Sequence, residues 1–154
     1  MASLVTAAMM MGPVRTLGQD LAIKTLTTTT SSIGSIISYL ATNTKPGASD
    51  IMNTLTSLDL EFTIGIIEDV VKDYDAKDLN NVAINKALSG VHEILELIHK
   101  ELNIIKGAIE YHNSKYFSGW RSFTWSGNLE AIKQYSVTLK NRYSMLFELL
   151  KIYC

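Results

Sequence analysis

One pair of residues in this sequence has the spacing of a metal-binding motif. His99 follows Glu96 by three positions, which places both side chains on one face of a helix. Di-iron carboxylate bundles use two such pairs and two further glutamates. Glu68, Glu130 and Glu148 are each followed three positions later by valine or lysine, so no second pair exists. Because half a site does not hold two irons, we expect neither a metal nor another cofactor.

The remaining histidine patterns favour structure over catalysis. His92 and Glu96 are four positions apart, the spacing of a surface pair along a helix. Histidine phosphotransfer bundles carry an exposed histidine followed closely by a Lys-Gly pair. Here Lys106 and Gly107 come about one helical turn too late after His99.

Patterns of other catalytic sites are also missing. None of the nine glycines belongs to a phosphate loop of the form G-x-x-x-x-G-K, and no serine lies in a G-x-S-x-G turn. Cys154 is the only cysteine and lacks the surroundings that activate a catalytic thiolate. We therefore expect that the protein is not an enzyme.

Residues 111–128, YHNSKYFSGWRSFTWSGN, hold six of the 13 aromatic residues. Their side chains either close the open end of a core or form a surface that binds a partner; a ligand site is a third interpretation. Interfaces favour Trp, Tyr and Arg as anchors. The candidate partner-binding residues are Tyr116, Phe117, Trp120, Arg121, Phe123 and Trp125. Single-strand nucleic-acid binders also mix bases with aromatics, but such domains are generally basic. Because the net charge is −1, we expect no nucleic-acid partner.

The elements that carry these residues are indicated by apolar spacing. Apolar, aromatic and a few polar residues recur at alternating steps of three and four, which places them on one stripe of a helix. The first such series is Ile84, Leu88, Val91, Leu95, Ile98, Leu102, Ile105, Ile109, His112 and Tyr116. The second is Leu129, Ile132, Ser136, Leu139, Tyr143, Leu146, Leu150 and Tyr153.

Two earlier segments are also predicted to be helical. The first has the stripe Ile23, Leu26, Thr30, Ile33, Ile37 and Leu40, although it is rich in threonine. The next carries two stripes, Ile51, Leu55, Leu58, Phe62 and Ile66, and then Leu60, Ile64, Ile67 and Val71. A helix that is apolar on two sides is buried on two sides, so this helix is either central in the bundle or lies between the bundle and a partner.

We predict an all-α fold in which one domain, residues 1–154, forms an up-down antiparallel four-helix bundle with long helices. The expected helices cover roughly 13–42, 50–74, 79–117 and 128–153, after an N-terminal arm at 1–12. The third helix would be about 50 Å long, so we expect a bend or break near Gly107.

Charge is unevenly distributed along the chain. Residues 50–78 contain eight acidic residues and two lysines, whereas residues 111–154 contain six basic and two acidic residues. We expect these segments to lie side by side and offset one another. The 20 residues of 25–44 are uncharged, which is the length of a membrane span. About half of them are Ser or Thr, so membrane contact is an alternative that we do not favour.

The cysteine content and the first residues indicate the compartment. With Cys154 alone, no internal disulfide can form, which fits a reducing compartment. The opening MASLVTAAMMM lacks the basic region of a secretory signal. We expect a reducing compartment and no secretion.

Two stretches carry a family resemblance: LTSLDLEFTIGIIEDVVKDYD, and HKELNIIKGAIEYHNSKYFSGWRSF further along the chain. Over about residues 50–154 the sequence resembles small helical, virion-associated proteins of large eukaryotic DNA viruses. The resemblance implies a virion or capsid-associated component and assigns no catalytic residues. By fold alone, such a bundle is also similar to the executioner domains of necroptosis-type proteins.

Together these features predict a non-catalytic helical interaction or structural protein, a minor capsid or virion-assembly component. Its partners would be other protein subunits in a homo- or hetero-oligomeric assembly. The alternative is a membrane-active bundle, pore-forming or executioner-type, whose first helix is released on triggering.

If Trp120 anchors a partner, Trp120→Ala will weaken assembly and leave the helix content nearly intact. Circular dichroism and the solution mass of the purified chain measure the two effects. A collapse of helix content and melting temperature would instead place Trp120 in the core.

Overall fold

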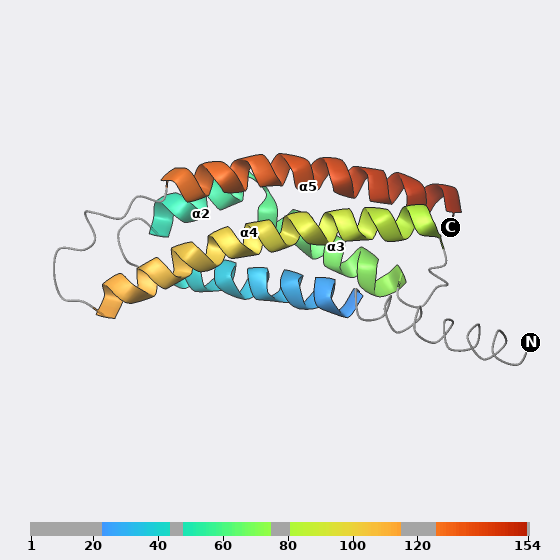
Figure 1. Cartoon of the computed structure of the whole chain (residues 1–154). Helices are drawn as coiled ribbons and strands as arrows, with labels where there is room; N and C mark the ends of the chain where they lie inside the picture. Colours follow the sequence, from blue (N-terminus) through green and yellow to red (C-terminus); the bar gives the residue numbers. More distant parts are fainter. Residues whose placement is uncertain (1–22, 44–47, 75–80, 115–125, 154) are drawn as a thin grey trace, which may run out of the picture.

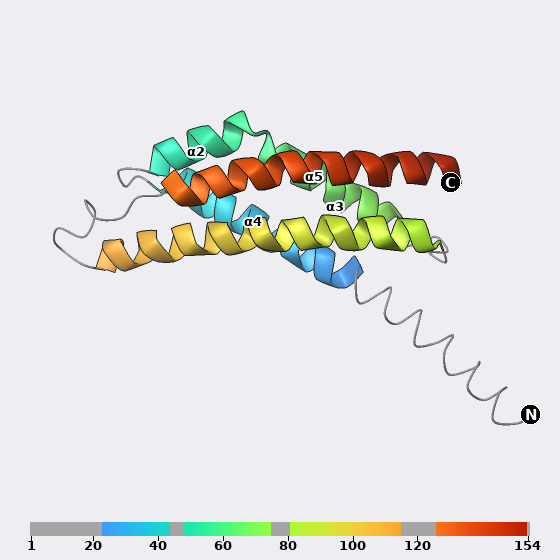
Figure 2. The same cartoon turned by 45° about the horizontal axis from the view of Figure 1, so that its top comes forward.

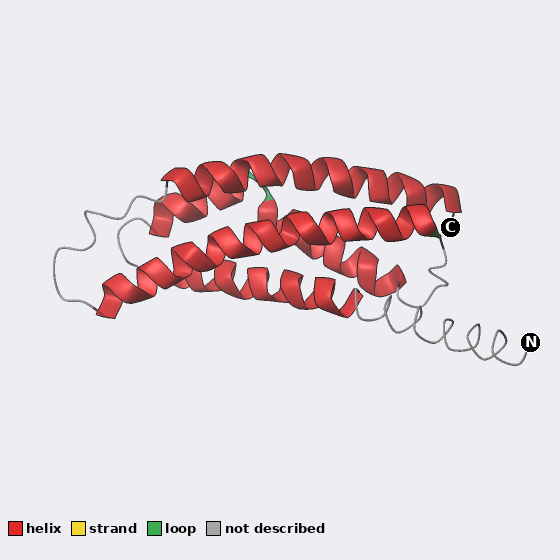
Figure 3. Cartoon of the chain, viewed as in Figure 1, coloured by secondary structure: helices red, strands yellow, loops and turns green. Residues whose placement is uncertain are grey.

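The computed structural model describes residues 23–43, 48–74, 81–114 and 126–153, which form helices and short connections with no strand among them (Figure 3). The predicted all-α class is confirmed for these residues. In chain order they are a first helix at 23–42, α2 (Ala48–Ser57), α3 (Leu60–Tyr74), α4 (Val82–Ser114) and α5 (Ser126–Tyr153).

The helices lie alongside one another as an elongated bundle (Figures 1 and 2). α4 and α5 have 33 and 28 residues, or about 50 and 42 Å at 1.5 Å per residue. They run antiparallel, side by side, in both views. The 23–42 helix runs in the same direction as α4, because Thr29 contacts Glu96 and Tyr39 contacts Lys106 with the same offset of 67 positions.

Side-chain hydroxyls explain how the threonine-rich segment remains helical. Thr28 donates to the Lys24 carbonyl at 2.8 Å, and Thr30 donates to the Thr27 carbonyl at 2.8 Å. Such bonds within the helix satisfy hydroxyls that would otherwise compete with it. The predicted core positions of this helix are all buried: Ile23, Leu26, Thr30, Ile33, Ile37 and Leu40.

The two long apolar series pack as predicted over most of their length. On α4 the buried positions are Ile84, Val91, Leu95, Ile98, Leu102, Ile105 and Ile109. On α5 they are Ile132, Ser136, Leu139 and Leu146. Tyr153, at the end of the series, is instead 58% exposed. α4 continues through Gly107, so the expected break near that residue is wrong. The side chain of His112 lies outside the described ones.

The predicted single helix over residues 50–74 is wrong, because the chain breaks at Asp59. This residue has φ of 55°, in the left-handed region that Asp and Asn tolerate better than most residues. Its N–H donates to the Thr56 carbonyl at 3.0 Å, and its carbonyl accepts from the Thr63 N–H at 3.0 Å. One residue thus ends α2 and starts α3.

The break at Asp59 changes which of the two apolar stripes is buried. Ile51 and Leu55 of α2 are buried, and the buried stripe then resumes at Leu60 of α3, five positions further. Phe62 and Ile66, which continue the α2 stripe in sequence, are 65% and 36% exposed. Instead of one helix buried on two sides, the segment is two helices that each bury one side.

The left-handed backbone at Asp59 predicts an order of stability. Asp59→Ala should lower the free energy of unfolding by about 1 kcal/mol, because Cβ opposes this conformation and alanine lacks a polar group to compensate. Asp59→Gly should not lower it, since glycine pays no Cβ penalty. Urea unfolding of both variants measures the difference; equal stability of the two would contradict the left-handed assignment.

Because the buried stripe changes at Asp59, substitutions at the nearby positions 62 and 64 should differ strongly in their effect on stability. Ile64→Ala should cost about 2–5 kcal/mol because it empties a core position. Phe62→Ala should change stability by no more than about 0.5 kcal/mol, as is usual for an exposed position. Thermal unfolding of the purified variants tests this. A large loss of stability in Phe62→Ala would show that Phe62 is buried, as an uninterrupted helix over residues 50–74 requires.

Candidate interaction surface

The outward side of α3 carries a stripe of exposed residues, which we call the α3 outer stripe. It consists of Phe62, Ile66, Asp69 and Asp73, at steps of four, three and four positions. Such steps align side chains along one face of a helix. The buried residues of α3 lie on the opposite side. The stripe is therefore apolar in its first half and acidic in its second.

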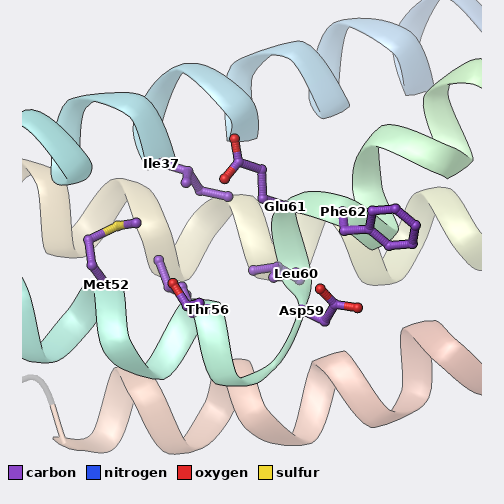
Figure 4. Close-up of a pocket in the computed structure, with 8 residues that line it drawn as sticks. Ile37, Met52, Thr56, Asp59, Leu60, Glu61 and Phe62 are labelled. Atoms are coloured by element: carbon purple, nitrogen blue, oxygen red, sulfur yellow. The ribbon is translucent and has the colours of Figure 1, made fainter.

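An open pocket of about 330 Å³ lies beside Phe62, between the 23–42 helix and the turn from α2 to α3 (Figure 4). Its walls are mainly apolar, with carboxylates from Asp59 and Glu61. The residues that line it are Ile37, Met52, Leu55, Thr56, Asp59, Leu60, Glu61 and Phe62. A pocket with this lining can admit an apolar side chain, and its carboxylates favour a basic neighbour.

A second exposed apolar surface lies on α5, on the side away from Leu139. Val137, Met145 and Ile152 are 60%, 66% and 71% exposed. Lys133 and Lys140 are exposed along its flank. We call these five residues, Lys133, Val137, Lys140, Met145 and Ile152, the α5 outer face. It combines apolar and basic side chains, whereas the α3 outer stripe combines apolar and acidic ones.

Aromatic contacts order the C-terminal half of α5. The rings of Tyr143 and Phe147 are stacked with centroids 6.1 Å apart, and the Lys151 ammonium lies 4.9 Å from the Phe147 ring centre. Burial raises the pKa of the Tyr143 hydroxyl, because the charged phenolate is disfavoured away from water. These contacts keep Phe147 against its own helix and leave Met145 facing solvent.

The acidic and basic surfaces do not neutralise one another within the described part of the chain. Residues 59–74 contain five acidic residues and one lysine, and α5 contains four basic and two acidic residues. Lys72 pairs with Glu68 of its own helix at 2.7 Å, and this hydrogen bond raises the pKa of Lys72. α3 and α5 do lie side by side, as expected. No ion pair of the described residues joins them.

Polar contacts between α4 and α5 fix how α5 is rotated. Arg142 Nη1 donates to the Gly90 carbonyl oxygen at 2.6 Å and lies 3.8 Å from a Glu93 carboxylate oxygen. Asn128 Nδ2 donates to Glu101 Oε2 at 2.7 Å. Hydrogen bonds with a charged partner are stronger than neutral ones. Both contacts hold the α5 outer face away from α4, and the half-buried Arg142 side chain is engaged with α4.

The residues with metal-ligand spacing make polar contacts with neighbouring side chains. Glu96 Oε1 accepts a hydrogen bond from Thr29 at 2.6 Å and lies 3.2 Å from His92 Nε2, a contact that is not aligned as a hydrogen bond. His99 Nε2 contacts Asn103 Nδ2 at 3.2 Å. The described residues contain no group of three or more His, Cys, Asp or Glu that could hold a metal ion.

None of the described helices combines the length and the apolar composition that crossing a membrane requires. The predicted partner-binding residues Tyr116, Phe117, Trp120, Arg121, Phe123 and Trp125 lie outside the described residues, and their role stays a prediction. Burial of one of the two stripes against a partner was one sequence expectation, but the sequence did not indicate which stripe. The stripe through Leu58, Phe62 and Ile66 is as regular as the one through Leu60 that the structure buries.

Comparison with known proteins gives one similarity. No protein-family model matches the chain, and no solved structure is significantly similar to it. It is similar to an uncharacterized protein of Acanthamoeba polyphaga mimivirus, with 32% identity over 72 residues. The match covers 47% of this chain and 35% of that protein, so the similar part spans about a third of the relative. The chain thus resembles a protein of a large DNA virus of a eukaryotic host.

Proposed function

We propose that this chain is a non-catalytic helical interaction protein that acts by binding other protein subunits, as a minor capsid or virion-assembly component. The observation that carries the proposal is the exposure of Phe62, which lines an open, mainly apolar pocket, and of Ile66, one turn further along α3. The mimivirus relative supports a viral setting. A virion or the host cytoplasm is the location that we propose with it.

The energetic argument rests on what Phe62 does in the isolated chain. Its ring is 65% exposed, so most of its apolar surface is in contact with water. Full burial of a phenylalanine side chain is worth about 1.5–3 kcal/mol. A partner that covers this ring gains much of that free energy, and the adjacent pocket supplies the concave shape in which interface anchors concentrate.

The break between α2 and α3 explains how the exposed surface around Phe62 arises. We regard the fold as an up-down four-helix bundle in which α2 and α3 together form the second rod. In an unbroken rod the stripe through Ile51 and Leu55 would keep Phe62 in the core. The left-handed turn at Asp59 instead places Phe62 outside, where it does not contribute to folding and is free to contribute to binding.

Cross-linking in the cells that naturally make the protein tests this proposal. A photoreactive phenylalanine analogue is placed at position 62 and, as a matched control, at Lys100 on the outer side of α4. We expect position 62 to yield protein adducts at least several-fold more abundantly than position 100. An absence of adducts from position 62, or equal yields from both positions, would refute the proposed function.

A further inference from the structure

We propose that the α3 outer stripe of one copy docks on the α5 outer face of a second copy of this chain. This inference rests on the proposed function, because it names the partner of the same surface. It also accounts for the second exposed apolar surface, on α5, which the proposed function leaves unused.

Charge complementarity selects a second copy as the occupant. Residues 59–74 contain five acidic residues and one lysine, and Asp69 and Asp73 have no ion-pair partner among the described residues. α5 contains four basic and two acidic residues, and Lys140 likewise has no ion-pair partner among the described residues. Complementary charges of this kind steer association and suppress wrong alignments.

The two surfaces also match in length when the helices run antiparallel. Phe62 and Asp73 are 11 positions apart, about 16 Å along a helix, and Met145 and Lys133 are 12 positions apart, about 18 Å. Phe62 then lies opposite Met145 while Asp73 lies opposite Lys133. Between these ends Ile66 lies opposite Lys140 and Asp69 lies opposite Val137, three positions along α5 from that lysine.

Charge excludes one parallel register but not the parallel direction. If Phe62 lay opposite Val137 with both helices running the same way, Asp73 would lie opposite Glu148, 11 positions further along α5, and the two carboxylates would repel. If Phe62 lies opposite Lys133 instead, Ile66 lies opposite Val137 and Asp69 opposite Lys140. The charges therefore support contact between the two surfaces in either direction.

Each copy carries both surfaces, and this determines the kind of assembly. The α3 outer stripe and the α5 outer face are both exposed in one molecule. A copy therefore makes two such contacts, either reciprocally in a two-fold dimer or in succession along a row of copies. In both cases Phe62 and Met145 lose their exposure. Asp69, Asp73 and Lys140 gain ion-pair partners, and Lys133, which lies 3.9 Å from Glu130 of its own helix, gains a second one.

Charge reversal tests the contact in the purified full chain. Sedimentation equilibrium measures self-association of the unchanged chain, of Asp69→Lys/Asp73→Lys and of Lys133→Glu/Lys140→Glu. Each double variant is expected to weaken the association constant at least about tenfold, because like charges then face each other. Lys86→Glu/Lys100→Glu on the outer side of α4 carries the same charge change as the second variant and should leave association unchanged.

Mixing the two reversed variants separates a contact between copies from a change within one chain. In an equimolar mixture the lysines at positions 69 and 73 of one variant meet the glutamates at 133 and 140 of the other. Association should recover to within roughly threefold of the unchanged chain. A failure to recover, or an equal loss in the α4 control, would overturn the proposed contact.

Two further variants test the apolar residues of the proposed contact. Phe62→Ser and Met145→Ser are each expected to weaken self-association several-fold while circular dichroism shows the same helix content, since both side chains are exposed. An unchanged chain that is monomeric up to about 1 mM, a concentration at which even weak specific contacts are populated, would refute self-association. If position 62 nevertheless cross-links to a different protein in its native cells, the proposed function stands and only the identity of the partner is wrong.

Discussion

The left-handed backbone conformation of Asp59 ends α2 and starts α3. It determines which apolar residues of these two helices are buried and which are exposed. A helix can hold one apolar stripe against a core that lies on one side of it. The stripe of Ile51 and Leu55 would continue through Phe62 if the helix were unbroken. With φ of 55° at Asp59, the stripe that begins at Leu60 takes its place.

The core on the other side of the molecule needs no such break. The buried residues of α4 follow regular alternating steps from Val91 to Ile109. On α5 the buried apolar residues are Ile132, Leu139 and Leu146. Hydrogen bonds between helices set how each helix is rotated about its axis. Arg142 of α5 donates to the Gly90 carbonyl of α4, and Thr29 of the 23–42 helix donates to Glu96 of α4. Apolar packing therefore supplies the stability, and a few polar contacts determine which faces remain outside.

The surface that results has an unusual distribution of charge for a chain with net charge near zero. The ion pairs of the described residues are mostly between neighbours on one helix, and the pair that crosses between helices, Arg142 with Glu93, joins α5 to α4. The acidic side of α3 and the basic flank of α5 keep their opposite charges in the folded chain. The proposed assembly rests on that separation, together with the exposed apolar side chains beside each charged surface.

The sequence by itself determined the helical class and the buried faces of three helices. Series such as Leu95, Ile98 and Leu102 have a period that only a helix can bury on one side, and threonines in the first helix do not disturb that period. It did not determine the state of residues 50–74. Two stripes there are equally compatible with one helix buried on two sides and with two helices buried on one side each.

Only the tertiary structure decided between these alternatives, because the choice depends on what the neighbouring helices can cover. The 23–42 helix, α4 and α5 offer one apolar wall to this segment, and a single wall buries one stripe at a time. The same reason explains why Phe62 could not be recognised as a surface residue from its apolar type. The pairing of charges was also undecided by sequence, since the partner of each charge is set by the rotation of its helix and not by its position in the chain.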